Sequence, residues 1–199
     1  SDRPLVADGS GEWIRGDVLG VLAARELGAQ VVVTPVSSNT VVERCGAFRE
    51  VHRTKIGSPY VIEAMTQAVR AGSKRVLGYE ANGGMLLQTS FEVIGGGKLE
   101  ALPTRDPLVV MLSVFASAAR RRCSVAALSA ELPRRVTASG RLQGLARTAT
   151  APLLDELAQG GPSFATKIFG AVAGVVQTVE LTDGVRLTTA GDRKSTRLN

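Results

Sequence analysis

A short run of β-branched residues, QVVVTPV at 30–36, limits what this chain can form. Such an apolar run predicts a buried strand. A second run, KRVLGYE at 74–80, leads into a glycine-rich loop. Helix signals separate the two runs across residues 12–122. Strands that alternate with helices predict an α/β layer with a mainly parallel sheet.

Two helices are predicted around these strands from their start and stop signals. Asp17 is expected to cap the first, which runs to about Leu27. The second is expected to start with Ser58 as N-cap and Pro59 at the first helical position, and to end at Gly72. The apolar residues of the second helix recur at helical spacing, as Val61, Met65, Ala68 and Val69.

A third helix is predicted from Asp106-Pro107, which repeats the combination of cap and proline. Three arginines, Arg120–Arg122, fall at its C-terminal end, where the helix dipole favours positive charge. Its predicted apolar stripe contains Leu108, Met111, Leu112, Phe115 and Ala119.

From residue 124 the pattern of the chain changes. SVAALSAEL predicts a short helix that ends at Pro133, and residues 151–172 are predicted to be mostly helical, with an interruption at Gly160-Gly161-Pro162. Two alternating runs around Asp183-Gly184 then predict a β-hairpin. These elements predict a second, α+β domain.

The composition favours a soluble protein that binds small anions. The 199 residues carry a net charge of +6, which fits either a nucleic-acid binder or a binder of small anions. Aromatic residues make up only 4%, so the stacking platforms that single strands need are scarce. A lone histidine, His52, argues against a multi-histidine zinc site and a Ser-His-Asp triad. No apolar run is long enough to cross a bilayer, and Cys45 and Cys123 match no metal or redox spacing, which fits a reducing compartment.

Residues 78–84, GYEANGG, place one acid and one amide among glycines where a strand is expected to end. Ligands of open α/β sheets bind beyond the carboxyl ends of the strands. Glu80 can accept hydrogen bonds from two neighbouring sugar hydroxyls, and Asn82 can both donate and accept. The glycines permit positive φ and a close approach of backbone to ligand. Taken alone, the stretch is as typical of a plain surface turn as of a ligand-binding loop.

Several stretches together resemble the α-D-phosphohexomutase family. SDRPLVAD resembles the end of the family's metal loop, DxDxDR, and GYEANGG resembles its sugar-binding loop, G-E-x-S/N-G. RGDVLGVLA, VVVTPVSSNT, RTKIGSPYVIEAM and TRDPL follow in the family's order, and TDGVRL resembles a hairpin of its fourth domain. The resemblance covers roughly residues 2–191, and the most similar members are phosphomannomutases and phosphoglucomutases.

This resemblance implies a fragment of a larger enzyme. Residues 1–11 are then the end of the second, metal-binding domain. Residues 12–123 are the third, sugar-binding domain, a three-layer α/β/α fold with a mainly parallel mixed sheet. Residues 124–191 are a truncated α+β C-terminal domain of the phosphate-binding type. Residues 192–199 are interpreted as a foreign or misread tail.

The resemblance also implies the chemistry. Members of the family interconvert hexose 6-phosphates and hexose 1-phosphates through a phosphoserine and a hexose 1,6-bisphosphate, with Mg²⁺ as cofactor. The implied partners are hexose phosphates, with no nucleic acid or membrane, and the implied location is cytoplasmic. The residues with an implied role are Asp2 as a Mg²⁺ ligand, Arg3 and Lys55 in the catalytic group, and Glu80, Asn82 and Gly57 in substrate binding.

Some features depart from the family pattern. Gly84 and Ser58 stand where some members carry histidine, so no acid–base role is transferred to these positions. The phosphoserine loop and the first two metal aspartates precede the position of Ser1 in the family. The family's phosphate-binding loop is expected after LTTAGDR, where KSTRLN stands instead. The 199-residue chain alone is therefore expected to lack mutase activity.

Other hypotheses remain open at this level. A non-catalytic sugar-phosphate-binding module on the same scaffold needs the same loops, and a phosphoglucosamine mutase needs a similar sugar site. A basic nucleic-acid-binding protein is a third interpretation of the charge. For Lys55, a solvated surface lysine is as good an interpretation as a residue of the cleft.

Overall fold

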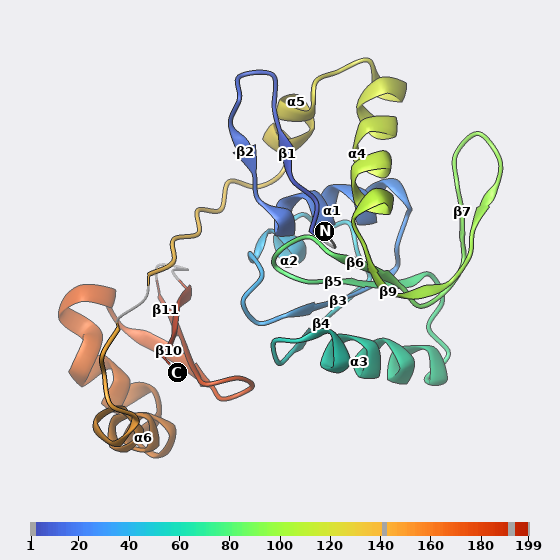
Figure 1. Ribbon diagram of the computed structural model, residues 1–199. Helices are drawn as coiled ribbons and strands as arrows, with labels where there is room; N and C mark the ends of the chain where they lie inside the picture. The colour runs from blue at the N-terminus through green and yellow to red at the C-terminus, as the bar shows by residue number, and fades with distance from the viewer. Residues whose placement is uncertain (1–2, 141–142, 191–193, 199) are drawn as a thin grey trace. The chain divides into compact units, whose positions relative to one another are not determined.

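A computed structural model describes residues 3–140, 143–190 and 194–198 of the protein (Figure 1). The chain divides into two compact units, Ser1–Val136 and Thr137–Asn199. Each unit has its own sheet and its own apolar core. Within the described part of the chain, no helix is both long enough and apolar enough to cross a lipid bilayer.

The first unit is built on a five-stranded sheet in the order β4-β3-β5-β6-β9. β3 pairs in parallel with β4 and β5, whereas β6 is antiparallel to both β5 and β9. Every strand of this sheet except β6 therefore runs in the same direction, which confirms the predicted mainly parallel sheet. The strands are β3 (Val31–Pro35), β4 (Glu50–Thr54), β5 (Val76–Tyr79), β6 (Met85–Leu87) and β9 (Leu102–Asp106).

Helices cover both faces of this sheet, as Figure 1 shows, and the predicted three-layer α/β/α architecture is confirmed. α3 (Ser58–Arg70) packs its buried Val61 and Met65 on one face. α1 (Gly16–Glu26) and α4 (Pro107–Arg121) pack together on the other face. The smaller elements of the unit are β1 (Val6–Ala7), β2 (Trp13–Ile14), α2 (Val41–Arg44), β7 (Phe91–Glu92), β8 (Lys98–Leu99) and α5 (Val125–Ala130).

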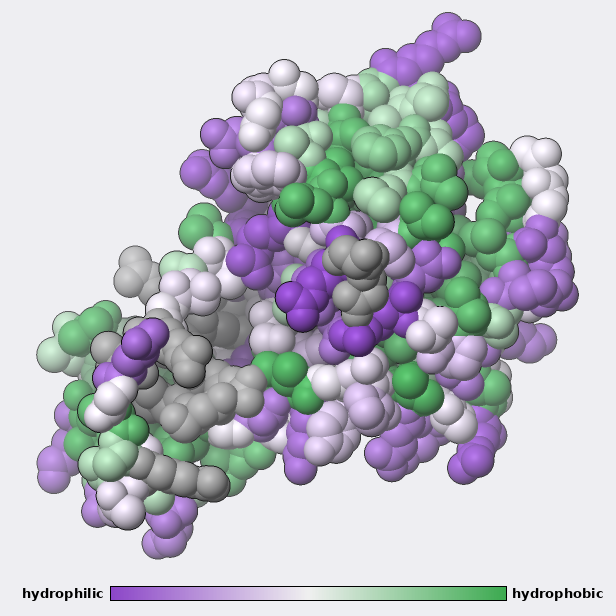
Figure 2. Space-filling model, viewed as in Figure 1, coloured by the Kyte–Doolittle hydropathy of each residue, from purple (hydrophilic) through white to green (hydrophobic). Residues whose placement is uncertain are grey.

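The predicted buried stripe of α4 is wrong. The Asp106 side chain caps the helix as predicted, by accepting from the backbone N–H groups of Leu108 and Val109. However, the buried residues are Val110, Ser113, Val114, Ser117 and Ala118. Small residues on this face let α4 approach α1 closely. Leu108, Leu112 and Phe115 are instead exposed, and Figure 2 shows apolar side chains over this helix.

Two predicted helix caps are also wrong. Asp17 lies inside α1, where its buried carboxylate accepts hydrogen bonds from Arg15 and from the backbone N–H of Asn39. Ser58 is the first helical residue of α3, and Gly57 takes the N-cap position with a φ of 128°. The sequence locates both helix starts, but tertiary contacts decide which donors a buried carboxylate binds.

Both expected boundaries of the first unit differ from the structure. β1 pairs with β2, so the hairpin spans the boundary expected after residue 11. The boundary expected after residue 123 is too early, because the unit extends to Val136. Leu128 and Leu132 belong to its core, and Arg135 donates a hydrogen bond to Thr40. These contacts attach α5 and the segment after it to the α/β layer.

The second unit combines one long helix with a small antiparallel sheet. The helix, α6 (Arg147–Ala173), is kinked at Gly161, which agrees with the predicted interruption. β10 (Val176–Glu180) and β11 (Val185–Thr189) form the predicted hairpin, in which Glu180 lies opposite Arg186. β12 (Lys194–Leu198), inside the segment interpreted as a tail, pairs with β11.

Gly78 gives a test of how closely α3 packs on the sheet. A Cβ there would lie 2.5 Å from Val61 Cγ1 and 3.0 Å from the backbone oxygen of Val33. We expect Gly78→Ala to lower the free energy of unfolding by about 1–3 kcal/mol, the usual cost of overpacking, in urea denaturation followed by circular dichroism. Gly9→Ala is the control, because no atom lies within 4 Å of its added Cβ. Equal denaturation midpoints for the two variants would contradict the packing seen here.

Candidate functional site

Four strands of the sheet end at one edge, which we call the carboxyl edge. β3 and β4 end side by side, with Pro35 paired to Thr54, and β5 ends at Tyr79. β9 ends there too, because its Asp106 pairs with Met85 at the start of β6. Ligands of open α/β sheets bind beyond such an edge. The candidate site is therefore formed by the loops that follow, 36–40, 55–57 and 80–84.

The loop 80–84 is held by its own hydrogen bonds. The Glu80 N–H donates to the Gly84 carbonyl at 3.0 Å, and the Gly83 N–H donates to the Glu80 carbonyl at 2.8 Å. Asn82 Oδ1 accepts from the Gly84 N–H at 2.9 Å. Asn82 is half-buried, and its Nδ2 group can donate a hydrogen bond.

The glycines of this region make room for other parts of the protein. Gly83 has a φ of +90°, and a Cβ there would lie 2.7 Å from Pro4 Cγ. A Cβ on Gly16, the first residue of α1, would lie 2.2 Å from the backbone carbon of Asn82. Gly16 and Gly83 thus allow the loop to contact α1 and the N-terminal segment, whereas the sequence predicted a close approach to a ligand for the glycines of residues 78–84.

Glu80 is the buried carboxylate of the carboxyl edge. Its side chain is only 9% exposed, and its Oε2 accepts a hydrogen bond from Arg105 Nη1 at 3.2 Å. Among the described residues, no donor contacts its other oxygen, Oε1. One oxygen of Glu80 is therefore held by Arg105, while the other makes no hydrogen bond to the described residues.

Arg105 was missed by sequence reasoning. It lies in β9, directly before the Asp106 that caps α4. A signal was present, because TRDP places an arginine directly before a helix start. A residue directly before a helix start can lie at the carboxyl end of a strand, which is where open α/β sheets bind their ligands.

Lys55 and Gly57 form the loop after β4. Lys55 is exposed, and its Nζ lies 5.8 Å from the centre of the Tyr60 ring. The φ of Gly57 is 128°, a value that favours glycine, and its carbonyl accepts from the Tyr60 N–H. Lys55 and Tyr60 line a cavity of about 350 Å³ together with Thr54, Glu63, Ala64 and Gln67. No carboxylate of the described residues forms an ion pair with Lys55.

Arg53 holds the loop after β3, a role that the sequence did not indicate. Its guanidinium donates to the carbonyls of Pro35 at 2.7 Å, Ser38 at 2.9 Å and Asn39 at 3.2 Å, and it also binds Glu43. From the other side, the buried Asp17 accepts from the Asn39 N–H at 2.8 Å. Arg15 in turn donates to both oxygens of Asp17. The loop 36–40 is thus held by a charge network with the buried Asp17 on one side and the partly buried Arg53 on the other.

Tyr79, the last residue of β5, directly precedes the loop 80–84 and is part of the core of the first unit. The residue is fully buried, and a Cβ on Gly20 would lie 2.7 Å from its ring. Within the described residues its hydroxyl has no hydrogen-bond partner. Burial raises the pKa of the Tyr79 phenol well above its usual range, so the ring stays neutral.

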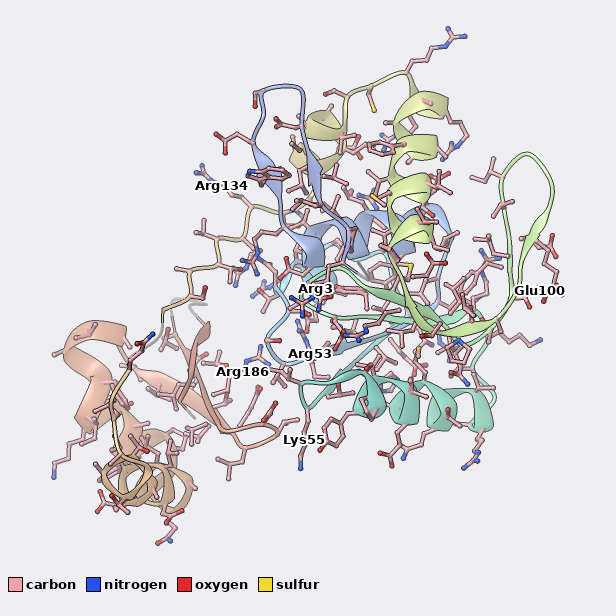
Figure 3. The ribbon with its side chains drawn as sticks, in the orientation of Figure 1. Arg3, Arg53, Lys55, Glu100, Arg134 and Arg186 are labelled. Atoms are coloured by element: carbon pink, nitrogen blue, oxygen red, sulfur yellow. The ribbon has the colours of Figure 1, made fainter. Side chains whose placement is uncertain are left out.

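The N-terminal segment meets the same edge through Pro4, which is buried beside Gly83. Arg3, directly before it, is exposed, and Figure 3 shows Arg3, Arg53 and Lys55 along this edge. Asp2, the predicted metal ligand, lies outside the described residues. The described residues contain no group of three or more His, Cys, Asp or Glu that could hold a metal ion.

Two phosphomannomutases and a phosphoglucosamine mutase are similar in sequence to much of this chain. It is 38% identical over 193 residues to the phosphomannomutase of Sinorhizobium fredii (strain NBRC 101917 / NGR234), a match that covers 97% of this chain and 40% of that protein. It is 45% identical over 145 residues to the phosphomannomutase of Salmonella muenchen, covering 72% and 29%. The phosphoglucosamine mutase of Gluconacetobacter diazotrophicus is 38% identical over 118 residues, covering 55% and 25%. The chain thus spans less than half the length of these relatives.

Solved structures share the fold. A phosphoglucomutase/phosphomannomutase family protein from Burkholderia thailandensis gives a TM-score of 0.62 at 20% identity, over 95% of this chain and 36% of that one. A structure from Thermus thermophilus gives a TM-score of 0.53 at 22% identity, over 94% of this chain and 35% of that one.

The match to a family model covers the part of the chain that carries the carboxyl edge. Residues 15–136 match the model described as phosphoglucomutase/phosphomannomutase, alpha/beta/alpha domain III. This span contains the five-stranded sheet, its covering helices and the loops 36–40, 55–57 and 80–84. The chain therefore belongs to the phosphoglucomutase/phosphomannomutase family.

Proposed function

We propose that the protein is a phosphohexomutase that interconverts hexose 6-phosphate and hexose 1-phosphate, with mannose or glucose as the sugar. The observation that carries the proposal is the burial and hydrogen bonding of the Glu80 carboxylate. This carboxylate is buried at the carboxyl edge, with one oxygen held by Arg105 and the other without a donor among the described residues. The names of the relatives support the same reaction class.

Sugar recognition is proposed for the loop 80–84. Glu80 Oε1 accepts a hydrogen bond from a hydroxyl of the hexose, and Asn82 Nδ2 donates to a neighbouring hydroxyl oxygen. A mutase has to bind its sugar in two orientations, with either phosphate at the reacting position. One acceptor and one donor on a firmly held loop can bind the ring hydroxyls in both orientations. Mannose and glucose share most of these hydroxyls, so both fit this arrangement.

Phosphate binding is proposed for the cations of the carboxyl edge. Lys55 has no carboxylate partner among the described residues, and its ammonium group is available to a phosphate. Arg3 follows the proposed metal ligand Asp2 in the sequence and adds a second positive charge, directly before the Pro4 that lies beside Gly83. Phosphoryl transfer depends mainly on positioning and on offsetting negative charge, and these residues serve both needs.

The proposed transfer passes through a phosphoserine and a hexose 1,6-bisphosphate, and no described residue is assigned as the phosphoryl donor. Mg²⁺ is the proposed cofactor, with Asp2 as a ligand, and when bound it offsets charge on the phosphoryl oxygens. The described residues do not make up a metal site. The proposed roles of Glu80, Asn82 and Lys55 do not depend on the ion.

Two alternatives are less well supported. Phosphoglucosamine mutases match this chain over 55% and 54% of its length, whereas a phosphomannomutase matches 97%. A nucleic-acid-binding role would need exposed, uncompensated cations. Many arginines of the first unit instead bind carboxylates, as do Arg15, Arg53, Arg105, Arg120 and Arg121.

Glu80→Gln tests the sugar site directly. In the complete gene product, we expect it to lower kcat/KM for hexose 6-phosphate by about a hundredfold, because an amide oxygen accepts hydroxyl hydrogen bonds more weakly than a carboxylate. The assay is conversion of mannose 6-phosphate or glucose 6-phosphate to the 1-phosphate. Glu92→Gln, at an exposed position in β7, is the control and should leave turnover unchanged. Normal kinetics in a folded Glu80→Gln variant would remove Glu80 from the site.

Lys55→Ala tests phosphate binding. We expect KM for hexose 6-phosphate to rise about tenfold with a smaller change in kcat, because the ammonium group binds phosphate in ground state and transition state alike. Lys74→Ala is the matched control, since this exposed lysine precedes β5 at the opposite edge of the sheet. If both variants give the same KM, Lys55 is a solvated surface lysine.

A further inference from the structure

The environment of Glu80 raises an electrostatic problem for an anionic substrate. The carboxylate is 9% exposed, so it has lost most of its contact with water. A buried carboxylate without a partner is costly to desolvate. It also repels a phosphate brought to the same edge. A site that binds hexose phosphates beside Glu80 therefore needs a cation that offsets this charge without blocking both carboxylate oxygens.

Arg105 meets both conditions. Its Nη1 donates to Glu80 Oε2 at 3.2 Å, and its side chain is 37% exposed. The contact leaves Oε1 without a donor among the described residues. Arg105 thus supplies positive charge at the rim of the site, while the oxygen that a hydroxyl needs stays available.

The backbones on both sides of this pair are held firmly. The next residue, Asp106, pairs with Met85 in the sheet, and its carboxylate caps α4. Glu80 is held by the hydrogen bonds of its loop to Gly83 and Gly84. Two side chains on rigid backbones lose little freedom when they pair, so the pair can set one orientation of the carboxylate.

We propose that Arg105 is the positioning residue of the sugar site: it orients the Glu80 carboxylate toward the hexose and offsets its charge so that a phosphorylated sugar can bind. The expected effect on catalysis rests on the proposed function, whereas the pairing of Arg105 with Glu80 is seen in the structure. In this role Arg105 acts through Glu80. The competing outcome is a direct contact between Arg105 and the substrate phosphate. In that case the loss of kcat/KM in Arg105→Gln would not depend on whether Glu80 is present.

A double-mutant cycle in the complete gene product separates these outcomes. We expect Arg105→Gln to lower kcat/KM for hexose 6-phosphate by about tenfold or more, and Arg105→Lys to recover part of the loss. In a Glu80→Gln background, the same Arg105→Gln change should have less than about a threefold effect, because the carboxylate that it positions is gone. Arg70→Gln, at an exposed position in the last turn of α3, is the control in both backgrounds. A full Arg105→Gln effect without Glu80 overturns the proposal, as does no effect in the wild-type background.

A second measurement does not depend on turnover. In ¹H–¹⁵N spectra of the 199-residue chain, Arg105→Gln should shift the amide resonances of loop 80–84, whereas Arg70→Gln should leave them in place. Unchanged loop amides in Arg105→Gln show that Arg105 does not position Glu80. Absence of hexose phosphate turnover in the wild-type gene product would instead refute the proposed function, and the spectra would still decide whether Arg105 positions the loop.

Discussion

The site depends on one close contact, in which the first residue of α1 packs backbone against backbone on the loop 80–84. A side chain on Gly16 would overlap Asn82, and one on Gly83 would overlap Pro4. The absence of side chains on both sides brings the helix, the N-terminal segment and the loop together. Because β5 leads directly into this loop, the contact also sets where Glu80 lies at the carboxyl edge.

Three acids near the carboxyl edge each bind an arginine. Asp17 pairs with Arg15 and Glu43 with Arg53, and the second pair also holds the carbonyls of loop 36–40. The Glu80–Arg105 pair extends this pattern to the proposed sugar site. Pairing matters here because an unpaired carboxylate in a partly dry site is costly and repels phosphate. The edge can therefore contain several acids and still accept an anionic ligand.

The sequence predicted the layers of the first unit because its apolar runs and helix starts are strong local signals. QVVVTPV became the buried strand β3, and Asp106-Pro107 became the start of α4. The buried face of α4 was missed, because apolar residues occur nearly all round this helix and spacing alone cannot select one face. The extent of the unit was missed as well, since Leu128 and Leu132 join its core across a polar stretch of sequence.

By itself, the sequence determined the alternation of helices and strands, the resemblance to phosphohexomutases and the position of Glu80 at the end of a strand. These features depend on neighbouring residues, whose spacing can be read along the chain. Only the tertiary structure decided that Arg105 binds Glu80, that Arg53 holds the loop 36–40, and that Gly16 and Gly83 make room for protein. Such contacts join residues far apart in the chain, and the sheet brings them together because its parallel strands all end at one edge.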